Sequence, residues 1–190
     1  MKNAFLLPTA RTDQALAIRK AVMPDIHDLL DLINGYAGKG IMLPRTEFEM
    51  SENIRDFTVA FADSQLVGCG ALHFYTPTSA EVRSLAVSEE HKQSGAERAI
   101  VKVLEQEALD AGLETIFAFT YVQQFFRKLG FVEGERGELP LKAWRDCLRC
   151  PKFQCCDEVA MLKVLRESPH ARVGYVEPSA ELIQLPTLHG

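Results

Sequence analysis

The chain has 190 residues, of which 47% are hydrophobic and 25% are charged, a balance typical of an ordinary soluble globular domain. Its formal net charge of −5 argues against nucleic acid as the main partner, because phosphate binding requires a basic surface. Every apolar run falls short of the ~18 residues that a membrane helix requires, and residues 5–7 are too short for the core of a signal peptide. We therefore expect a cytoplasmic protein with no membrane partner.

The first third of the chain predicts one strand and two helices. Residues 15–22 alternate like a strand, and Pro24 with Asp25 then opens a helix. Three glycines are expected to break this helix into a flexible loop: Gly35, Gly38 and Gly40. Thr46 with Glu49 matches a capping box and predicts a second helix to about residue 54.

The next two segments predict a β-hairpin. Residues 57–62 and 66–75 read as strands, and the three residues between them are short enough for a hairpin turn. Gly68 and Gly70 lie inside the second strand, where glycine indicates a bulge or the close approach of another backbone.

Residues 81–131 form the stretch around which the chain is organised. A strand pattern enters a polar loop with Gly95, a helix pattern follows at once, and Gly112 ends that helix as a C-cap does. Free backbone N–H groups and the helix dipole both favour an anion at a helix N-terminus. The order of strand, glycine loop and helix therefore predicts a phosphate-bearing ligand there.

The remaining patterns complete one sheet. Residues 115–119 and 159–165 read as strands, residues 123–129 as a short aromatic helix, residues 131–132 as the start of a strand and residues 141–147 as a helical turn. This order of elements predicts an α/β fold (α+β mixed sheet), with one central mixed sheet and helices on both faces.

We divide the chain into an N-terminal arm at residues 1–16, a single domain at residues 17–165 and a C-terminal extension at residues 166–190. The extension is too apolar for a free solvated tail. We expect its apolar residues to pack on the domain or on a second subunit, as in a homodimer; they are Val173, Tyr175, Val176, Leu182, Ile183, Leu185 and Leu188.

Over residues 17–165 the pattern resembles the GNAT superfamily of acetyl-CoA-dependent N-acetyltransferases. The resemblance rests on the strand RSLAV, the loop HKQSGAER and the segment FFRKLGF. The segments LINGYAGKGIMLPR, NIRDFTVA, VGCGALH and AEVRSLAV are similar to the short, stand-alone N-acetylglutamate synthase-like branch. The resemblance implies a GNAT fold, acetyl-CoA as co-substrate, no metal, and acetyl transfer to the α-amine of an acidic amino acid, with L-glutamate expected as in arginine biosynthesis.

The resemblance also implies where acetyl-CoA binds. In the family, the strand that here holds Leu85, Ala86 and Val87 splays from its neighbour, pairs with the pantetheine arm and can offer an N–H to the thioester oxygen. Leu85 and Val87 can also be plain buried strand residues, and the two interpretations coexist. The pyrophosphate loop of the family falls on Lys92, Gln93, Ser94, Gly95, Ala96, Glu97 and Arg98.

Glu97 is the main departure from the family loop, which has Gly or Ala at that place. It puts a side chain and a negative charge where the backbone meets phosphate, whereas Lys92 in place of Arg loses only the bidentate fork. The simpler interpretation is that Glu97 stabilises the first turn of a helix through the dipole. Glu97 leaves a second hypothesis open, a GNAT-fold binding or regulatory module with an impaired acetyl-CoA site.

Acetyl transfer to an amine requires a base and, in many family members, a tyrosine that protonates the leaving thiolate. Glu81 is the family-like base, acting through water; the alternative is a solvated strand end. Phe126 takes the place of the family tyrosine, where we expect it to contact the cofactor without donating a proton. Tyr121 can substitute as the acid, or is a loop aromatic with a wet hydroxyl.

An acidic acceptor requires arginine forks for its carboxylates. Arg45 matches an arginine of the synthase branch, and Arg83 shares a strand face with Glu81 because it follows two residues later. For each arginine the alternative is a surface ion pair.

Four of the five cysteines lie close together, at Cys147, Cys150, Cys155 and Cys156. A thiolate pair at C-x2-C spacing suits zinc, which leaves a metal- or redox-responsive domain as a third hypothesis. The similar Cys-rich segment of synthase-like sequences favours reduced structural thiols instead. Cys69 lies in a strand and is expected in the core.

Overall fold

The computed structural model describes residues 16–92, 94–135, 139, 148, 150, 152 and 155–167. The elements follow one another in the predicted order. They are β1 (Ala17–Lys20), η1 (Met23–Asp25), α1 (Ile26–Ala37), α2 (Glu47–Asn53), η2 (Ile54–Asp56), β2 (Phe57–Ala62), β3 (Gln65–Phe74), β4 (Ser79–Val87), η3 (Glu89–His91), α3 (Ala96–Asp110), β5 (Thr115–Thr120), α4 (Gln123–Arg127), β6 (Val132–Glu133) and β7 (Val159–Val164).

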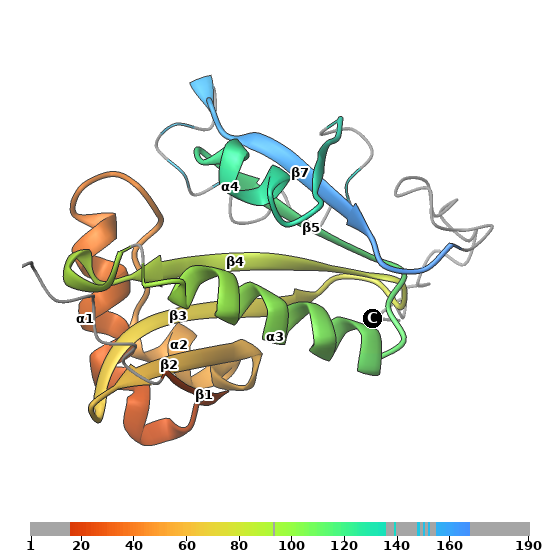
Figure 1. Ribbon diagram of the computed structural model, residues 1–190. Helices are drawn as coiled ribbons and strands as arrows, with labels where there is room; N and C mark the ends of the chain where they lie inside the picture. The colour runs from red at the N-terminus through yellow and green to blue at the C-terminus, as the bar shows by residue number, and fades with distance from the viewer. Residues whose placement is uncertain are drawn as a thin grey trace, which may run out of the picture.

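The strands form one seven-stranded sheet in the order β1-β2-β3-β4-β5-β7-β6 (Figure 1). All neighbouring strands are antiparallel except β4 and β5, which are parallel. The prediction of a mixed α/β sheet is therefore confirmed. The parallel pair lies in the middle of the sheet, where helices can cover both faces.

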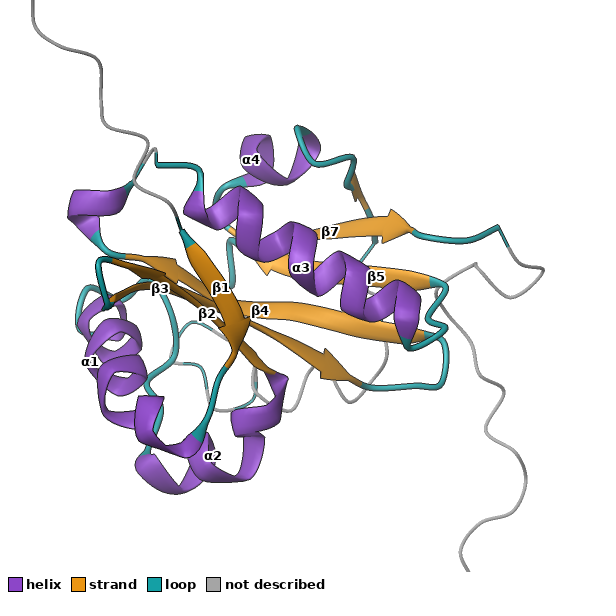
Figure 2. Ribbon diagram, turned by 60° about the horizontal axis from the view of Figure 1, so that its bottom comes forward, coloured by secondary structure: helices purple, strands orange, loops and turns teal. Residues whose placement is uncertain are grey.

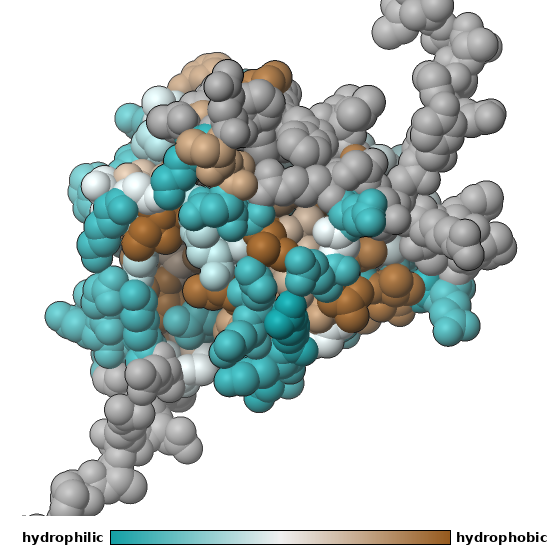
Figure 3. Space-filling model, turned by 90° about the horizontal axis from the view of Figure 1, so that it is seen from above, coloured by the Kyte–Doolittle hydropathy of each residue, from teal (hydrophilic) through white to brown (hydrophobic). Residues whose placement is uncertain are grey.

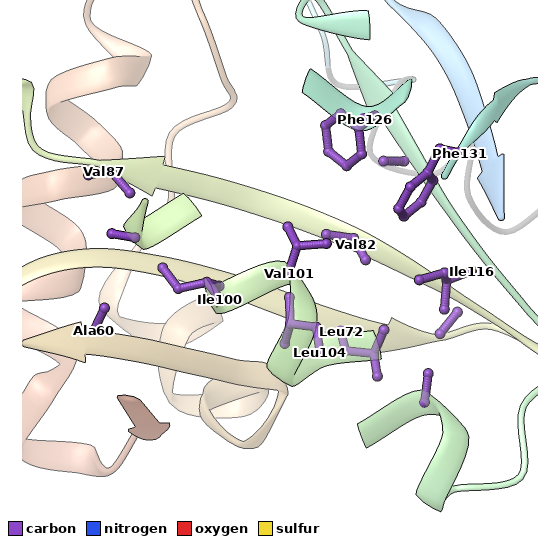
Figure 4. Close-up of a cluster of buried hydrophobic side chains, with 14 of the residues drawn as sticks. Ala60, Leu72, Val82, Val87, Ile100, Val101, Leu104, Ile116, Phe126 and Phe131 are labelled. Carbon is purple, nitrogen blue, oxygen red and sulfur yellow. The ribbon is translucent and has the colours of Figure 1, made fainter. Parts of the chain in front are cut away.

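Helices cover both faces of the sheet, as predicted (Figure 2). α1 and α2 pack on one face, where Leu29, Ile33 and Met50 are fully buried against β2 and β3. α3 packs on the other face through Ile100, Val101 and Leu104 (Figure 4). Each fully buried aliphatic side chain contributes about 1.5–3 kcal/mol relative to an exposed one, so these rows hold the helices in place.

Gly68 and Gly70 allow α3 to lie close to β3. A Cβ at Gly70 would lie 2.8 Å from Ile100 Cγ2, and a Cβ at Gly68 would lie 2.9 Å from Val87 Cγ2. At Gly68 another backbone also lies close, since a Cβ there would lie 3.2 Å from Ala86 O, whereas at Gly70 the close atoms belong to side chains. The predicted irregularity is present as well, as a register shift between Cys69 and Ala71.

Local signals identified most turns and caps correctly. Thr46 Oγ1 accepts a hydrogen bond from Glu49 N at 3.2 Å, and Thr46 N donates to the Glu49 carboxylate at 3.0 Å, which completes the capping box. The β2–β3 turn has Asp63 and Ser64 at φ of 48° and 67°, as a tight hairpin requires.

The prediction that Gly35 breaks the first helix is wrong. α1 continues through Gly35 to Ala37, and Gly38 N donates to Asn34 O at 2.9 Å. One glycine inside a helix costs only about 1 kcal/mol. The burial of Ile33 and Tyr36 on either side offsets that cost.

Several predictions fall outside the described residues. They are the helical turn at residues 141–147, nearly all of the N-terminal arm, and the apolar residues of the C-terminal extension.

On the face shown in Figure 3, apolar side chains of the described residues lie in several small groups separated by polar ones.

Candidate functional site

The two central strands separate after three residue pairs. β4 pairs with β5 at Ser79–Thr115, Ala80–Ile116 and Glu81–Phe117. Beyond Glu81 the two described strands no longer pair, and they diverge toward their C-terminal ends (Figure 1). An unpaired strand edge presents backbone N–H and C=O groups to an extended ligand. This divergence lies where the splayed strand at residues 84–87 was expected.

A bulge at Ser84 marks the divergence. Ser84 has a φ of 52°, a conformation that typically costs a non-glycine residue about 1–3 kcal/mol. Its carbonyl accepts a hydrogen bond from the Cys69 thiol at 3.5 Å. Bulges re-aim side chains: beyond this one, Leu85 contacts the α3 core, whereas Ala86 faces α1 and α2.

The loop before α3 has the backbone expected for an anion site. Gly95 has a φ of 87° and forms the N-cap, and Ala96 N donates to Ser94 Oγ at 3.2 Å. Glu97 is partly exposed in the first turn, and Arg98 is exposed. Gln93 lies outside the described residues. The loop therefore combines an open glycine backbone with a carboxylate in the first helical turn.

A lysine pair lies between this loop and α1. Lys92 Nζ lies 2.8 Å from a Glu89 carboxylate oxygen, and Lys39 Nζ lies 3.1 Å from the other. Both ammonium groups lie over the Tyr36 ring, with Lys39 Nζ 5.2 Å and Lys92 Nζ 5.4 Å from its centroid. The hydrogen bond to Glu89 raises the pKa of Lys92. Tyr36 Oη donates to Val87 O at 2.5 Å, which ties α1 to the end of β4.

Glu81 is a buried carboxylate at the point where the strands part. The residue is 8% exposed, and its Oε2 accepts a hydrogen bond from Tyr75 Oη at 2.9 Å. The Tyr75 ring packs against Phe117, with centroids 5.8 Å apart. The alternative of a solvated strand end is therefore wrong. A buried, hydrogen-bonded carboxylate at this place can act as a chemical base.

Asp56 links two further side chains on the same face of the sheet. His73 Nδ1 lies 2.5 Å from Asp56 Oδ2, and Arg83 Nη2 lies 3.7 Å from the same oxygen. The Arg83 side chain is 9% exposed, so the predicted alternative of a surface ion pair does not describe it. Register pairs His73 with Glu81 directly across β3 and β4. Arg83 therefore shares the face of Glu81, as expected.

Arg45 is held by its backbone at the end of the α1–α2 loop. Arg45 N donates to Asn34 Oδ1 at 2.9 Å, and Asn34 Nδ2 donates to Arg45 O at 3.0 Å. The side chain is half-buried. The loop that carries it rises past the C-terminal end of β4 (Figure 1). A contact between Arg45 and an acceptor stays a prediction.

Tyr121 and Phe126 lie in different environments. Tyr121 follows β5 and is 37% exposed, with Lys152 Nζ 3.4 Å from its hydroxyl. Burial, and to a lesser degree Glu158, raises the pKa of Tyr121, so the phenol keeps its proton. Phe126 is 3% exposed and packs edge-on against Phe131 in the α3 core. This packing accounts for the burial of Phe126 without a ligand, and its contact with the cofactor stays a prediction.

The cysteines divide into one core thiol and a group near the end of the domain. Cys69 is fully buried, as predicted, and burial raises the pKa of its thiol to about 12. Cys150, Cys155 and Cys156 are free thiols, and Cys147 lies outside the described residues. Among the residues that the structure describes, no cluster of three or more His, Cys, Asp or Glu side chains could hold a metal ion.

Sequence reasoning missed Asp56, His73 and Tyr75 as parts of this site. His73 and Tyr75 alternate on a predicted strand, and a short turn separates that strand from Glu81. Pairing these two strands as a hairpin would have brought both residues beside Glu81. Asp56 carried no comparable signal.

None of the described helices has the length and apolar character that a membrane span requires.

The model of the acetyltransferase (GNAT) family matches residues 24–131. An uncharacterized N-acetyltransferase of Chlorobaculum tepidum is 42% identical over 159 residues, which cover 84% of this chain and 100% of that protein. An amino-acid acetyltransferase of Mycobacterium tuberculosis is 35% identical over 121 residues, or 62% of this chain and 69% of that protein.

Solved structures show the same fold. N-acetylglutamate synthase from Neisseria gonorrhoeae, complexed with coenzyme A and N-acetyl-glutamate, matches with a TM-score of 0.73 at 24% identity, covering 80% of this chain but only 36% of that one. Rv2747 from Mycobacterium tuberculosis, in complex with CoA and NLQ, matches with a TM-score of 0.69 at 29% identity, covering 79% of this chain and 99% of that one. With its divergent central strands and its glycine loop before α3, the chain belongs to the GNAT family of acetyltransferases.

Proposed function

We propose that this acetyltransferase moves an acetyl group from acetyl-CoA to the α-amine of an acidic amino acid, with L-glutamate as the acceptor. The observation that carries the proposal is Glu81. It is a buried carboxylate, held by Tyr75 at 2.9 Å, at the point where β4 and β5 separate. A base at that place lies next to the open edge on which a thioester can be held.

The chain offers acetyl-CoA an edge and a loop. The edge is β4 beyond Glu81, where backbone groups of Leu85, Ala86 and Val87 can pair with an amide-bearing arm. The loop at Gly95 has the left-handed backbone that lets amides approach phosphate oxygens. Glu97 opposes this fit by its charge. We therefore expect acetyl-CoA binding to be weakened and not abolished.

The proposed chemistry removes two protons from the acceptor nitrogen and returns one proton to the thiolate. Glu81 accepts a proton from the ammonium group of the acceptor, directly or through water, and the neutral amine then attacks the thioester carbon. The C–N bond forms, the nitrogen gives its second proton to water, the C–S bond breaks, and CoA leaves as a thiolate. Tyr121 is positioned after β5 and keeps its proton at neutral pH, so it is the candidate that returns a proton to the thiolate.

Acceptor recognition rests on arginine. Arg45 and Arg83 are assigned to the carboxylates of the acceptor, Arg45 more firmly, because it matches an arginine of the synthase-like branch. The Mycobacterium relative is named an amino-acid acetyltransferase, and the Neisseria structure contains N-acetyl-glutamate. Those two names support an amino-acid acceptor with a carboxylate.

The test is an acceptor survey with the wild-type protein. Each of the twenty amino acids is incubated with acetyl-CoA, and free CoA thiol and acetylated product are measured together. We expect glutamate to give equal amounts of thiol and N-acetylglutamate, ahead of the neutral and basic amino acids. Preference for a basic acceptor would refute the acidic assignment. Absence of turnover with every acceptor would favour the impaired binding module.

A further inference from the structure

We propose that the Asp56–His73 pair is a proton relay that takes the acceptor's proton from Glu81 and returns it to solvent. The inference rests on the proposed function, because it concerns the fate of the proton that acetyl transfer releases. It adds two residues to the site, one from β3 and one from η2.

The first observation is the position of His73. In the β3–β4 ladder His73 lies directly opposite Glu81, so both side chains project from the same face of the sheet. Side chains that face each other in this way have Cβ atoms about 4.5–5.5 Å apart. The His73 and Tyr75 rings contact each other edge-on, with centroids 4.9 Å apart, and Tyr75 donates to Glu81. His73 therefore lies opposite the base across the ladder and also contacts Tyr75, which holds the base.

The second observation is how Asp56 holds the imidazole. Asp56 Oδ2 lies 2.5 Å from His73 Nδ1. In the neutral ring this contact places the proton on Nδ1, which leaves Nε2 as a proton acceptor. Among the described residues no hydrogen bond to Nε2 is present. A carboxylate on one nitrogen and an open second nitrogen is the arrangement of a general base.

The third observation is the gradient of exposure. Glu81 is 8% exposed, whereas the side chains of His73 and Asp56 are 21% and 26% exposed. A proton left on Glu81 after the first transfer must reach solvent before the next cycle. His73 lies beside Glu81 and nearer to solvent, so it offers that route.

Arg83 is the second charged neighbour of Asp56. Its guanidinium lies 3.7 Å from the same Asp56 oxygen that binds the imidazole. A cationic His73 is attracted by Asp56 and repelled by Arg83, so the two neighbours act on its charge in opposite directions. The charged and titratable groups described around His73 are Asp56, Glu81, Arg83 and Tyr75.

The relay balances as three successive proton transfers. Glu81 first takes one proton from the ammonium group and becomes a neutral acid. His73 Nε2 then takes that proton, directly or through water, which restores the Glu81 carboxylate. The imidazolium finally gives the proton to bulk water or buffer, and no other reactant is required.

The test compares His73→Gln, His73→Ala and wild type in steady-state acetyl transfer. The assay uses whichever amino acid the wild-type protein acetylates fastest, so the relay is tested even if glutamate is not that acceptor. His73→Gln keeps a side-chain N–H for Asp56 but cannot carry a proton. We expect kcat to fall roughly 10- to 100-fold, with KM values within about twofold. Added imidazole should restore much of the rate of His73→Ala, because it can enter the space that the side chain leaves.

The matched control is His27→Gln. His27 also lies beside a carboxylate, with Nε2 3.6 Å from Asp31 Oδ2, but its side chain is 85% exposed on α1. We expect wild-type kcat for this variant. Three results would each overturn the relay and leave the proposed function standing. They are a wild-type kcat for His73→Gln, an effect of His73→Gln on KM only, and a loss of rate in His73→Ala that imidazole does not relieve. Absence of turnover by wild type with every amino acid would overturn the relay together with the proposed function.

Discussion

The face of the sheet that carries Glu81, His73 and Arg83, here called the acceptor face, differs from the first turn of α3 in how its charged side chains are held. On the acceptor face, Glu81 is bound by Tyr75, and Asp56 joins His73 to Arg83. In the first turn of α3, Glu97 and Arg98 have no hydrogen bond or ion pair to any described residue. On the acceptor face, contacts between side chains hold them in place. In the first turn of α3, the backbone conformation is fixed but these side chains are not.

This difference indicates which step each region controls. Proton transfer requires groups held in place, since a catalytic group must meet its partner at hydrogen-bond distance. Binding of a phosphate by backbone amides requires only the loop conformation, which Gly95 supplies. Changes on the acceptor face should therefore lower the rate of chemistry, whereas changes in the first turn of α3 should alter affinity for acetyl-CoA.

Replacement of Glu81 should have the largest effect. Glu81→Gln keeps the shape of the side chain but removes the base, so kcat should fall roughly 100- to 10,000-fold. Affinity for acetyl-CoA, measured by calorimetry, should change little. Glu133→Gln is the control, because Glu133 is a strand carboxylate whose side chain is 56% exposed. Retention of more than a tenth of the wild-type kcat by Glu81→Gln would remove Glu81 as the base.

Replacement of Arg45 should have the next largest effect, a loss of affinity for the acceptor. A charge-assisted hydrogen bond typically contributes ~1.5–3 kcal/mol, so Arg45→Ala should weaken acceptor binding about tenfold or more. The measurement is the KM for glutamate at saturating acetyl-CoA. The control is Arg55→Ala, at an exposed arginine in η2. Unchanged KM in a folded Arg45→Ala protein would exclude Arg45 from the site.

Replacement of Glu97 should have the opposite sign. Removal of a negative charge from the first turn of α3 should tighten acetyl-CoA binding by a few fold, and added salt should shrink the gain because it screens the repulsion. Glu97→Gln tests the charge alone, and Glu97→Gly also removes the volume. The measurement is the Kd of acetyl-CoA at low and high salt. Equal Kd values for all three proteins would show that Glu97 points away from the phosphates.

The smallest expected effect lies outside the site, at the entry to α1. Arg19 forms two hydrogen bonds to Asp25, at 2.6 and 2.8 Å, and these hold the pKa of the Asp25 carboxyl below its usual range. A lowered pKa in the folded state stabilises the protein above the unfolded pKa of about 3.9. That contribution disappears as the pH falls through the lowered value.

Arg19→Gln should therefore lower the melting temperature at pH 7 by a few degrees, and the difference from wild type should diminish at the acidic end. Lys102→Gln, at an exposed position on α3, provides the control. A difference between Arg19→Gln and wild type that is the same at every pH would show that the ion pair is not its cause.

Local patterns were enough to predict the element order, whereas the position of the strand divergence was expected from the resemblance to the GNAT superfamily. Caps, glycine turns and period-two alternation depend on neighbours in the sequence, so Thr46, Gly95 and Gly112 were interpreted correctly. Glu81 was also identified, but its burial was not, because burial depends on Tyr75 and Phe117 from neighbouring strands.

The parts that could not be predicted depend on register and on contacts between distant segments. Asp56 and His73 are 17 residues apart and meet only because η2 ends beside β3. The bulge at Ser84 resets the alternation of β4, so that Leu85 and Arg83 face opposite sides of the sheet. In α1, burial of Ile33 and Tyr36 outweighed the local propensity of Gly35 to end the helix.

The most direct test of the central claim is calorimetry of the wild-type protein with acetyl-CoA, followed by glutamate. If the divergent strands and the α3 loop form a working site, one acetyl-CoA should bind per chain, and glutamate should then produce the sustained heat of turnover. The same injection into Glu81→Gln should give no such heat. Binding of glutamate without any heat from acetyl-CoA at millimolar concentration would contradict the account and identify a GNAT-fold binding module instead.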